Sequence, residues 1–510
     1  MRRIPYPRRT GLTLILALLA SLDGFPPGAS AQTPADDSAN RAWQAGAIGE
    51  AQALRRFLDP DRGVQPTPPI IPGFEIDRDA SGFVATDQPG GPTATAGNPF
   101  FEDLGTNGRT CFTCHQPETG WTVSARRVEE RFLLSLGSDP IFRLVDGATC
   151  PTDDVSSLAA KAEAYRLLLS KGLIRIGLPI PANAQYEVLS VDDPYGCNTN
   201  PDTGLTGPAS GVISVYRRPL PSTNLGFLSA IMWDGREPSL LSQANDATLG
   251  HAQANAPLSA AQQQQVVAFE SGLFTAQIYD DEAKTLTDDG ATGGPATLAQ
   301  QLEGFFVGIN DPLGHNPTGA PFTSQIFDLY GAWGGLSGTD DVTEDRQAVA
   351  RGEALFNETA INITGVAGLN DALDVASIPG TCGTCHDTPN VGDHSVKLPL
   401  DIGIADAGAA SPPALDISGL PVFTLHCVSG PFQGATYTIT DPGRALISGA
   451  CADIGKLKGP ILRGLAARAP YFHNGSAASL RDVVDFYDQR FSIGFTEREK
   501  SDLVAFLRTL

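Results

Sequence analysis

Hydrophobic side chains recur at helical spacing in three stretches near the end of the chain. They predict one helix over residues 343–356, a second over 480–491 and a third over the last fifteen residues. Thr496 is followed three residues later by Glu499, a capping-box pattern that is expected to start the last helix. We therefore predict a helical C-terminal domain over residues 340–510.

Residues 32–339 have a less regular pattern and are predicted to form an N-terminal domain. Within it, the segment from about 140 to 225 is rich in Gly, Pro, Asp and Asn, which favours a long loop-rich insertion. A small domain of its own would explain the same composition. Apart from the paired motifs described below, the sequence shows no internal repeat.

The hydrophobic run nearest the start of the chain has a different character. Four arginines precede the apolar residues 12–22, and the small residues Ala29-Ser30-Ala31 follow, a pattern typical of a signal peptide. We expect residues 1–31 to be cleaved on export, which leaves a soluble periplasmic protein without stable membrane insertion. An uncleaved anchor is the alternative. No later stretch is long and uncharged enough to cross a bilayer.

Charge narrows the range of partners. The 510 residues include 35 basic and 57 acidic side chains, a formal net charge of -22. Binding to nucleic acid or to anionic lipid requires a positive face that displaces counterions, so neither partner is expected. A protein partner should be basic or neutral.

The cysteines carry the strongest chemical signal. Residues 111–115 read Cys-Phe-Thr-Cys-His and residues 382–386 read Cys-Gly-Thr-Cys-His, two copies of the c-type haem attachment motif. In each copy two thiols bond one porphyrin and the adjacent histidine binds its iron. A zinc site would need four ligands, which neither copy has nearby. We predict two covalently bound haem c groups, held by Cys111, Cys114 and His115 and by Cys382, Cys385 and His386.

Four further cysteines are expected to form disulfides in an oxidising compartment. Of the three connectivities, the most economical joins Cys150 to Cys197 and Cys427 to Cys451. The first bridge would staple the insertion.

Two more stretches follow the haem motifs. Residues 232–237 read Met-Trp-Asp-Gly-Arg-Glu, and residues 460–475 run from Pro-Ile-Leu-Arg to Tyr-Phe-His-Asn-Gly. In this order the chain resembles the bacterial di-haem cytochrome c peroxidase family, which includes the di-haem enzymes of methylamine utilisation. The resemblance implies a mainly α fold with two cytochrome c-like haem domains. It also implies that the terminal helices of the second domain cross where a glycine admits an aromatic side chain.

The resemblance implies roles for particular residues. Peroxide would meet the iron held by His115, and electrons would arrive at the haem held by His386. Trp233 would lie between the haems and pass electrons, with a purely structural tryptophan as the alternative. Arg236 would pair with a haem propionate. His473 would lie near the second haem and anchor a propionate or a loop, unless its role is only structural.

The chain also departs from the family at the distal pocket of the first haem. The position where the peroxidases carry a glutamate is Gln253, which cannot act as a base. His251, two residues earlier, is an imidazole of the kind that moves protons near neutral pH. It is expected to shape the distal pocket with Gln243, with an iron ligand or a structural residue as alternatives.

The chain also departs from the family's pattern at the second haem. The family commonly supplies a methionine before the Pro-x-Leu-Arg stretch, and here the corresponding residues include Lys456, which could coordinate only if deprotonated. Met232 is either packing or a displaced ligand. His394 and His426 are expected on loops, with a sixth-ligand role as the alternative. Family members often hold calcium between the domains, but no acidic cluster in the sequence marks such a site.

These observations predict a di-haem peroxidase. It would reduce hydrogen peroxide with electrons from a small donor of the cytochrome c or cupredoxin type that docks on an acidic surface. A di-haem oxidase or oxygenase acting on an organic or protein substrate is the second hypothesis. A non-catalytic electron-transfer cytochrome with both irons capped is the third.

Overall fold

The computed structural model describes residues 67–198 and 212–510, which belong to one compact unit. The predicted signal peptide and residues 32–66 of the predicted N-terminal domain lie outside the described residues. Within those residues, no helix combines the length and the apolar character needed to cross a membrane.

The helices lie in both halves of the sequence and begin at polar caps. Ser124, Ser239 and Ser479 each accept a hydrogen bond from the backbone N–H three residues later, which satisfies a donor that the first turn leaves open. The helices are α3 (Ala125–Ser135), α4 (Leu158–Ala164), α5 (Arg166–Lys171), α6 (Leu240–Gly250), α7 (Ala260–Ser271), α8 (Pro295–Gln301), α9 (Asp341–Glu358), α10 (Ala445–Ser448), α11 (Leu480–Phe491) and α12 (Glu497–Arg508).

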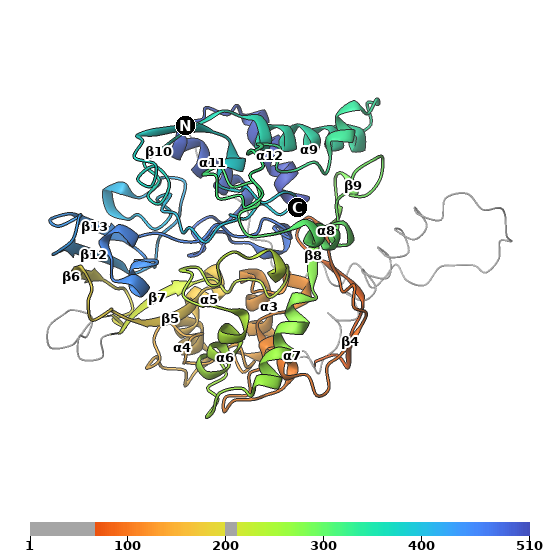
Figure 1. Ribbon diagram of the computed structural model, residues 1–510. Helices are drawn as coiled ribbons and strands as arrows, with labels where there is room; N and C mark the ends of the chain where they lie inside the picture. The colour runs from red at the N-terminus through yellow and green to blue at the C-terminus, as the bar shows by residue number, and fades with distance from the viewer. Residues whose placement is uncertain (1–66, 199–211) are drawn as a thin grey trace, which may run out of the picture. The chain divides into compact units, whose positions relative to one another are not determined.

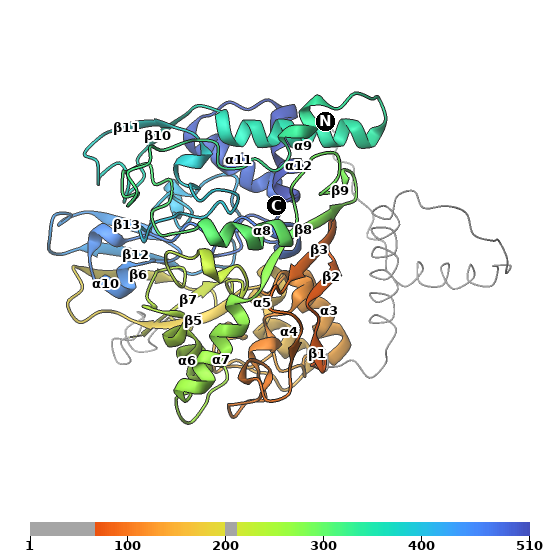
Figure 2. The same cartoon turned by 45° about the vertical axis from the view of Figure 1, so that its right-hand side comes forward.

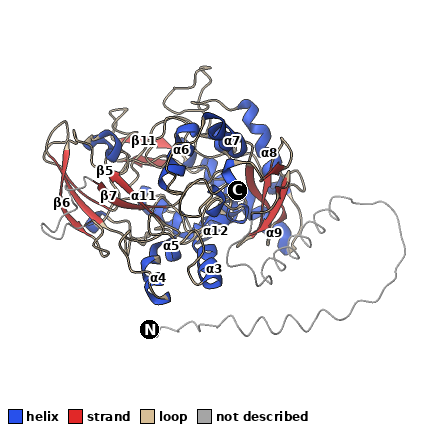
Figure 3. Cartoon of the chain, turned by 90° about the horizontal axis from the view of Figure 1, so that it is seen from below, coloured by secondary structure: helices blue, strands red, loops and turns tan. Residues whose placement is uncertain are grey.

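Short antiparallel sheets lie among these helices, as Figures 2 and 3 show. Their strands are β1 (Ile70–Ile71), β2 (Phe74–Arg78), β3 (Gly82–Asp87), β4 (Thr93–Ala94), β5 (Ile174–Pro179), β6 (Tyr186–Asp192), β7 (Val212–Arg217), β8 (Phe274–Asp280), β9 (Lys284–Thr285), β10 (Ile361–Thr364), β11 (Ser377–Gly380), β12 (Val422–Cys427) and β13 (Thr436–Ile439). The larger sheets have the orders β2-β3-β8-β9 and β13-β12-β6.

The predicted mainly α fold is not confirmed. Helices account for 31% of the structure and strands for 17%. The segment at 140–225 was expected to be loop-rich, yet its described part contains α4, α5 and strands β5 to β7. β5 and β7 pair with each other within the segment, whereas β6 finds its partner far away in the sequence: Ser190 in β6 pairs with Thr424 in β12. Local composition therefore could not reveal that pairing.

The helices predicted at the end of the chain are confirmed, and Figure 1 shows α9 and α12 side by side. A Cβ added at Gly352 of α9 would lie 2.0 Å from the carbonyl oxygen of Asp502 and 2.6 Å from Cβ of Phe506, both in α12. Only glycine fits at this crossing. The expected close approach of a glycine and an aromatic residue is thus confirmed. The proposed domain boundary at 339/340 falls just before α9 and stays a prediction.

One of the two predicted disulfides is present. Cys427 and Cys451 are bonded and tie β12 to the short helical turn that begins at Cys451. Cys150 and Cys197 lie within hydrogen-bond reach of each other but are free thiols, so the structure does not contain the bridge expected to staple the insertion.

Candidate functional site

The first haem motif forms a short 3₁₀ helix that turns His115 inward. The imidazole Nδ1 lies 2.8 Å from the carbonyl oxygen of Trp121 and 3.0 Å from Oγ of Ser222. Because a carbonyl oxygen only accepts, Nδ1 carries the proton and Nε2 keeps its lone pair. Burial lowers the pKa of His115 to about 4, which also favours the neutral ring. This is the tautomer that an iron ligand requires.

The second motif repeats this geometry. Nδ1 of His386 donates to the carbonyl oxygen of Gly392 at 2.7 Å, and burial lowers the pKa of His386 to about 4. In both motifs the accepting carbonyl lies six residues after the histidine. Each site therefore presents two half-buried cysteines and one imidazole nitrogen, the donor set of a covalently attached haem.

An extended cavity with a volume of about 160 Å³ opens at the first motif. The cavity brings together every residue predicted for the first haem site. Its lining includes Cys111, Cys114, His115, Trp233, Arg236, Gln243 and His251.

Two arginines that form no ion pair with a described carboxylate line the same cavity, together with Lys458. Arg218 donates to the carbonyl oxygens of Lys171, Val123 and Arg468, and Arg468 donates to those of Gly464 and Ile461. No described carboxylate forms an ion pair with either guanidinium. Burial lowers the pKa of Arg218 to about 9, that of Arg468 to about 10 and that of Lys458 to about 8. Buried cations of this kind call for anionic partners, and a haem carries two propionates. The residues present fit the group.

Arg236 and His473 belong to a buried network of charges next to the cavity. Asp234, which is fully buried, pairs with Arg217 at 2.5 Å and with Arg236 at 3.0 Å. Arg217 also pairs with Asp441 at 2.6 Å. His473 lies 3.7 Å from Asp441, and burial lowers the pKa of His473 to about 4.

The turns that carry Trp233 and His473 are copies of one another. Met232 and Phe472 have φ of 67° and 65°, and Gly235 and Gly475 have φ of 65° and 63°. Ile231, two residues before Trp233, bridges to Glu237, and Tyr471, two residues before His473, bridges to Ala477 in the same way. A helix capped by serine follows each turn. The sequence analysis missed this repeat, although Gly, Ser and Leu recur at a constant separation of 240 residues in the two turns.

The two copies face each other. The ring centroids of Trp233 and His473 are 6.2 Å apart in a T-shaped arrangement. The backbone N–H of Lys458 donates to the carbonyl oxygen of Trp233 at 2.8 Å, and that of Arg218 donates to the carbonyl oxygen of His473 at 2.6 Å. The indole Nε1 of Trp233 donates to the carbonyl oxygen of Arg218 at 2.8 Å. His473 therefore lies against Trp233, between the two halves of the repeat.

Aromatic side chains continue from Trp233 towards the second motif. Trp233 shares a hydrophobic cluster with Phe472 and Tyr487. The ring centroids of Phe472 and Tyr487 are 6.3 Å apart, and those of Tyr487 and His386 are 6.4 Å apart. A path of packed rings thus joins the first cavity to the second haem motif.

The helices that follow the two turns place different side chains near the two haem motifs. Ala247 of α6 and His251, which directly follows it, line the first cavity. The matching positions in α11 are Tyr487, which contacts His386, and Phe491, which packs with Cys382 and Cys385. Ala247 leaves space beside the first motif, where His251 lines the cavity, while large aromatic side chains occupy both equivalent positions at the second.

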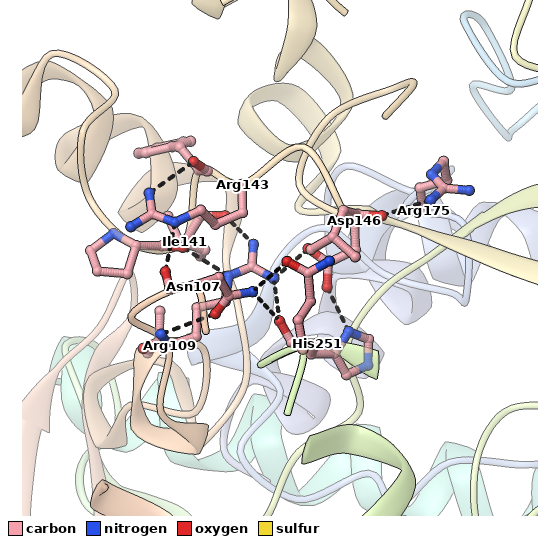
Figure 4. A network of polar contacts seen from close by, with 12 residues as sticks. Asn107, Arg109, Ile141, Arg143, Asp146, Arg175 and His251 are labelled. Carbon is pink, nitrogen blue, oxygen red and sulfur yellow. Dashed lines mark hydrogen bonds and ion pairs between the residues drawn. The ribbon is translucent and has the colours of Figure 1, made fainter. Parts of the chain in front are cut away.

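His251 and Gln253 differ in their relation to the cavity. His251 lines it, and its Nδ1 lies 2.5 Å from Oδ2 of Asp146, as Figure 4 shows. Gln253 lies outside the lining and is 3.4 Å from the amide of Asn107. The sequence analysis missed Asp146, and no local signal could have found it, because it lies 105 residues before His251.

The other residues considered as ligands of the second haem have different surroundings. The ammonium of Lys456 is 3.6 Å from Asp453 and 3.8 Å from Asp371. His394 lies on a loop, as expected, but it is 3% exposed and lies 3.2 Å from Asp387. His426 lies in β12 beside Thr436. Met232 lines the first cavity. Within the described ranges, no group of three or more His, Cys, Asp or Glu side chains is arranged to hold a metal ion such as calcium.

Known proteins of similar sequence bear on this arrangement. Cytochrome-c peroxidase IdrP1 of Pseudomonas sp. (strain SCT) is 32% identical over 141 residues, covering 25% of this chain and 36% of that protein. Methylamine utilization protein MauG of Methylorubrum extorquens is 25% identical over 318 residues, covering 59% of this chain and 66% of that protein. The resemblance to di-haem cytochrome c peroxidases is confirmed.

The extent of these matches is limited. The chain spans 36%, 38% and 18% of the length of the first three relatives that it matches. No family model matches the chain. The crystal structure of a MauG-like protein associated with microbial copper homeostasis is 17% identical, covers 81% of this chain and 86% of that chain, and has a TM-score of 0.35.

Proposed function

We propose that this protein is a periplasmic di-haem peroxidase. It reduces hydrogen peroxide at the haem of His115 with electrons supplied by a small donor protein of the cytochrome c or cupredoxin type. The observation that carries the proposal is the cavity at the first motif, which has an imidazole on its wall, beside a second motif whose equivalent space is filled by Tyr487 and Phe491.

Each haem has a defined set of residues to hold it. The first would be bonded to Cys111 and Cys114 and ligated by His115, with its propionates near Arg218 and Arg468. The second would be bonded to Cys382 and Cys385 and ligated by His386. When bound, these groups supply redox-active iron and accept or release one electron each.

Side chains of the protein provide a path for electrons and a group that transfers protons. Hydrogen peroxide takes up two electrons and two protons and leaves as two waters, so two donor molecules are oxidised in each turnover. Tyr487, Phe472 and Trp233 provide the packed path between the two haem sites. His251, on the cavity wall, is the side chain placed to move protons.

The test is a donor-oxidation assay on exported protein that carries both haems. Mixing it with peroxide and a reduced c-type cytochrome should oxidise the donor at two equivalents per peroxide, faster than the haems autoxidise. An electron paramagnetic resonance spectrum of the oxidised protein should show one high-spin iron. No turnover together with two low-spin, six-coordinate irons would contradict the proposal and favour a non-catalytic electron-transfer cytochrome.

A second candidate function is an oxidase or oxygenase acting on an organic or protein substrate. Two observations favour it: the similarity to MauG, and Gln253 at the position of the peroxidase glutamate. Product formed from a supplied organic substrate with oxygen and a reduced donor, without added peroxide, would favour this function over the peroxidase.

A further inference from the structure

His251 is joined to a carboxylate that comes from a different part of the chain. His251 follows α6 directly and lines the first cavity, and its Nδ1 lies 2.5 Å from Oδ2 of Asp146. Asp146 is 4% exposed and lines the same cavity. It lies in the 140–225 segment, 105 residues before His251.

The carboxylate is held charged and fixed in direction. Arg109 donates to Oδ1 of Asp146 at 2.5 Å and is itself anchored by the carbonyl oxygens of Pro140, at 2.8 Å, and Ile141, at 2.6 Å. Burial would raise the pKa of Asp146, but Arg109 and His251 outweigh burial and hold the pKa below its usual value. Figure 4 shows Asp146 between these two side chains.

The backbone at His251 is fixed as well. Its carbonyl oxygen accepts hydrogen bonds from Asn107 at 2.8 Å and from Arg109 at 3.3 Å. A Cβ at Gly105 would lie 1.8 Å from the carbonyl oxygen of Ala252, so only glycine allows this contact. Residues 105–109, just before the first haem motif, therefore fix the backbone here at two points, the carbonyl oxygen of His251 and that of Ala252.

The geometry points to His251 and Asp146 as the distal proton-transfer pair of the first haem site, with Asp146 and Arg109 as positioning residues. This inference rests on the proposed function and explains how the site works without the family's glutamate. The carboxylate accepts the Nδ1 proton, so Nε2 of the neutral ring keeps a lone pair for the cavity. The charged and titratable groups that face this ring are Asp146, Arg109 and His115.

The pair moves one proton without consuming it. Nε2 takes a proton from hydrogen peroxide and gives it to the departing oxygen. That oxygen already carries the other hydrogen of the peroxide, so it leaves as water, and the remaining oxygen becomes the second water by taking up two protons from solvent. The two electrons come from the donor protein, so atoms and charge balance.

Cyanide binding tests the pair without turnover. Hydrogen cyanide must lose a proton to bind iron as the anion, whereas carbon monoxide binds without any proton transfer. In exported di-haem protein, His251→Gln should slow cyanide association at neutral pH by about 100-fold, the lower end of general-base effects. Asp146→Asn, which disfavours the required tautomer, should slow it by about 10-fold to 100-fold. Carbon monoxide association should stay within twofold of wild type in both variants.

A second histidine–aspartate pair provides the control. Nδ1 of His315 lies 2.6 Å from Asp311, away from the cavity lining, so His315→Gln should leave cyanide association unchanged. Unchanged cyanide rates in His251→Gln, or equal losses for cyanide and carbon monoxide, would overturn the inference. So would faster cyanide binding in His251→Gln, which would mark His251 as an iron ligand. His251→Gln decides the question even if Asp146→Asn, which leaves Arg109 without its carboxylate, fails to fold.

These outcomes are independent of the donor-oxidation assay. Absence of peroxidase turnover would contradict the proposed function while leaving the cyanide comparison in force. Normal turnover with unchanged cyanide rates would contradict only the proton-transfer pair.

Discussion

The buried cations that line the cavity lead to a prediction about one residue, Arg468. Arg468 lines the cavity, and its hydrogen bonds go to carbonyl oxygens only. If it lies against a haem propionate, Arg468→Gln removes a positive charge that favours the reduced iron. A charged hydrogen bond worth about 1.5 kcal/mol corresponds to about 60 mV for one electron, so the potential of the first haem should fall by an amount of this order.

Spectroelectrochemical titration measures this potential. Arg126→Gln is the matched control, because Arg126 is exposed and pairs with Glu130 on the surface of α3. It should leave both potentials unchanged. A fall of the second haem's potential in Arg468→Gln, with the first unchanged, would place the Arg468 guanidinium at the other group.

Residues whose chemistry is local could be predicted from the sequence, and those that depend on distant contacts could not. The haem motifs are visible because two thiols and a histidine must be adjacent to bind one porphyrin. His251 was found because it lies near an expected glutamate position. Asp146 was not, since its role depends on a chain reversal that brings residues 105 positions apart into contact.

At the scale of helices, the crossing of α9 and α12 predicts a strong steric effect. Gly352→Ala places a methyl group where Asp502 and Phe506 already lie, so the two helices must separate. Overpacking of this kind typically costs about 1–3 kcal/mol, more than the roughly 1 kcal/mol that alanine gains over glycine within a helix. The free energy of unfolding, measured by denaturant titration, should therefore fall. Gly304→Ala, which meets no atom within 4 Å, should not lower it.

A second prediction concerns the carboxyl group that ties α9 to the loop before it. Glu353 is 3% exposed and accepts hydrogen bonds from the backbone N–H groups of Leu329 and Tyr330. Burial raises its pKa to about 7, although these bonds oppose the shift. The folded state therefore binds this proton more tightly than the unfolded state. The resulting stability is fully present below about pH 4.5 and is lost as the pH rises through 7.

Glu353→Gln should remove this dependence. Between pH 5 and 8 the wild type should lose about 2–3 kcal/mol relative to the variant, from 1.36 kcal/mol per pKa unit. Unfolding free energies of both proteins across this range provide the measurement. Parallel pH profiles would show that Glu353 has the same proton affinity in the folded and unfolded states.

Helix ends and sheet pairing differ in how far the sequence determines them. The caps at Ser479 and Thr496 are four-residue patterns that satisfy their own backbone donors, so the sequence was sufficient. Strand β6 pairs with β12, which lies more than 200 residues later, and its side chains alternate around a core that both strands share. The position of β6 in a sheet depends on its partner strand β12, which the sequence around β6 does not reveal.

At the scale of the whole molecule, the two haem sites are related by an internal repeat whose halves meet at Trp233 and His473. Each half also supplies a cation, Arg218 or Lys458, whose backbone N–H holds the other half's turn. The repeat gives both motifs the same framework, while α6 and α11 give them different surroundings. One motif can then be open and the other filled without a change of architecture.

Trp233 is the residue through which the two halves should communicate, and its replacement is the last prediction. Trp233→Phe keeps a ring in the cluster but loses the hydrogen bond to Arg218 and the more easily oxidised indole. Electron transfer from the second haem to the first should slow by about tenfold or more, equivalent to 1.4 kcal/mol of added barrier. Rapid mixing of peroxide with protein in which only the second haem is reduced measures this step. Trp333→Phe is the matched control, because Trp333 is also fully buried and donates to one carbonyl oxygen, that of Asp288, in a core away from the cavity. Equal rates in wild type and Trp233→Phe would mean that electrons pass between the haems without the indole, and the repeat would then serve packing alone.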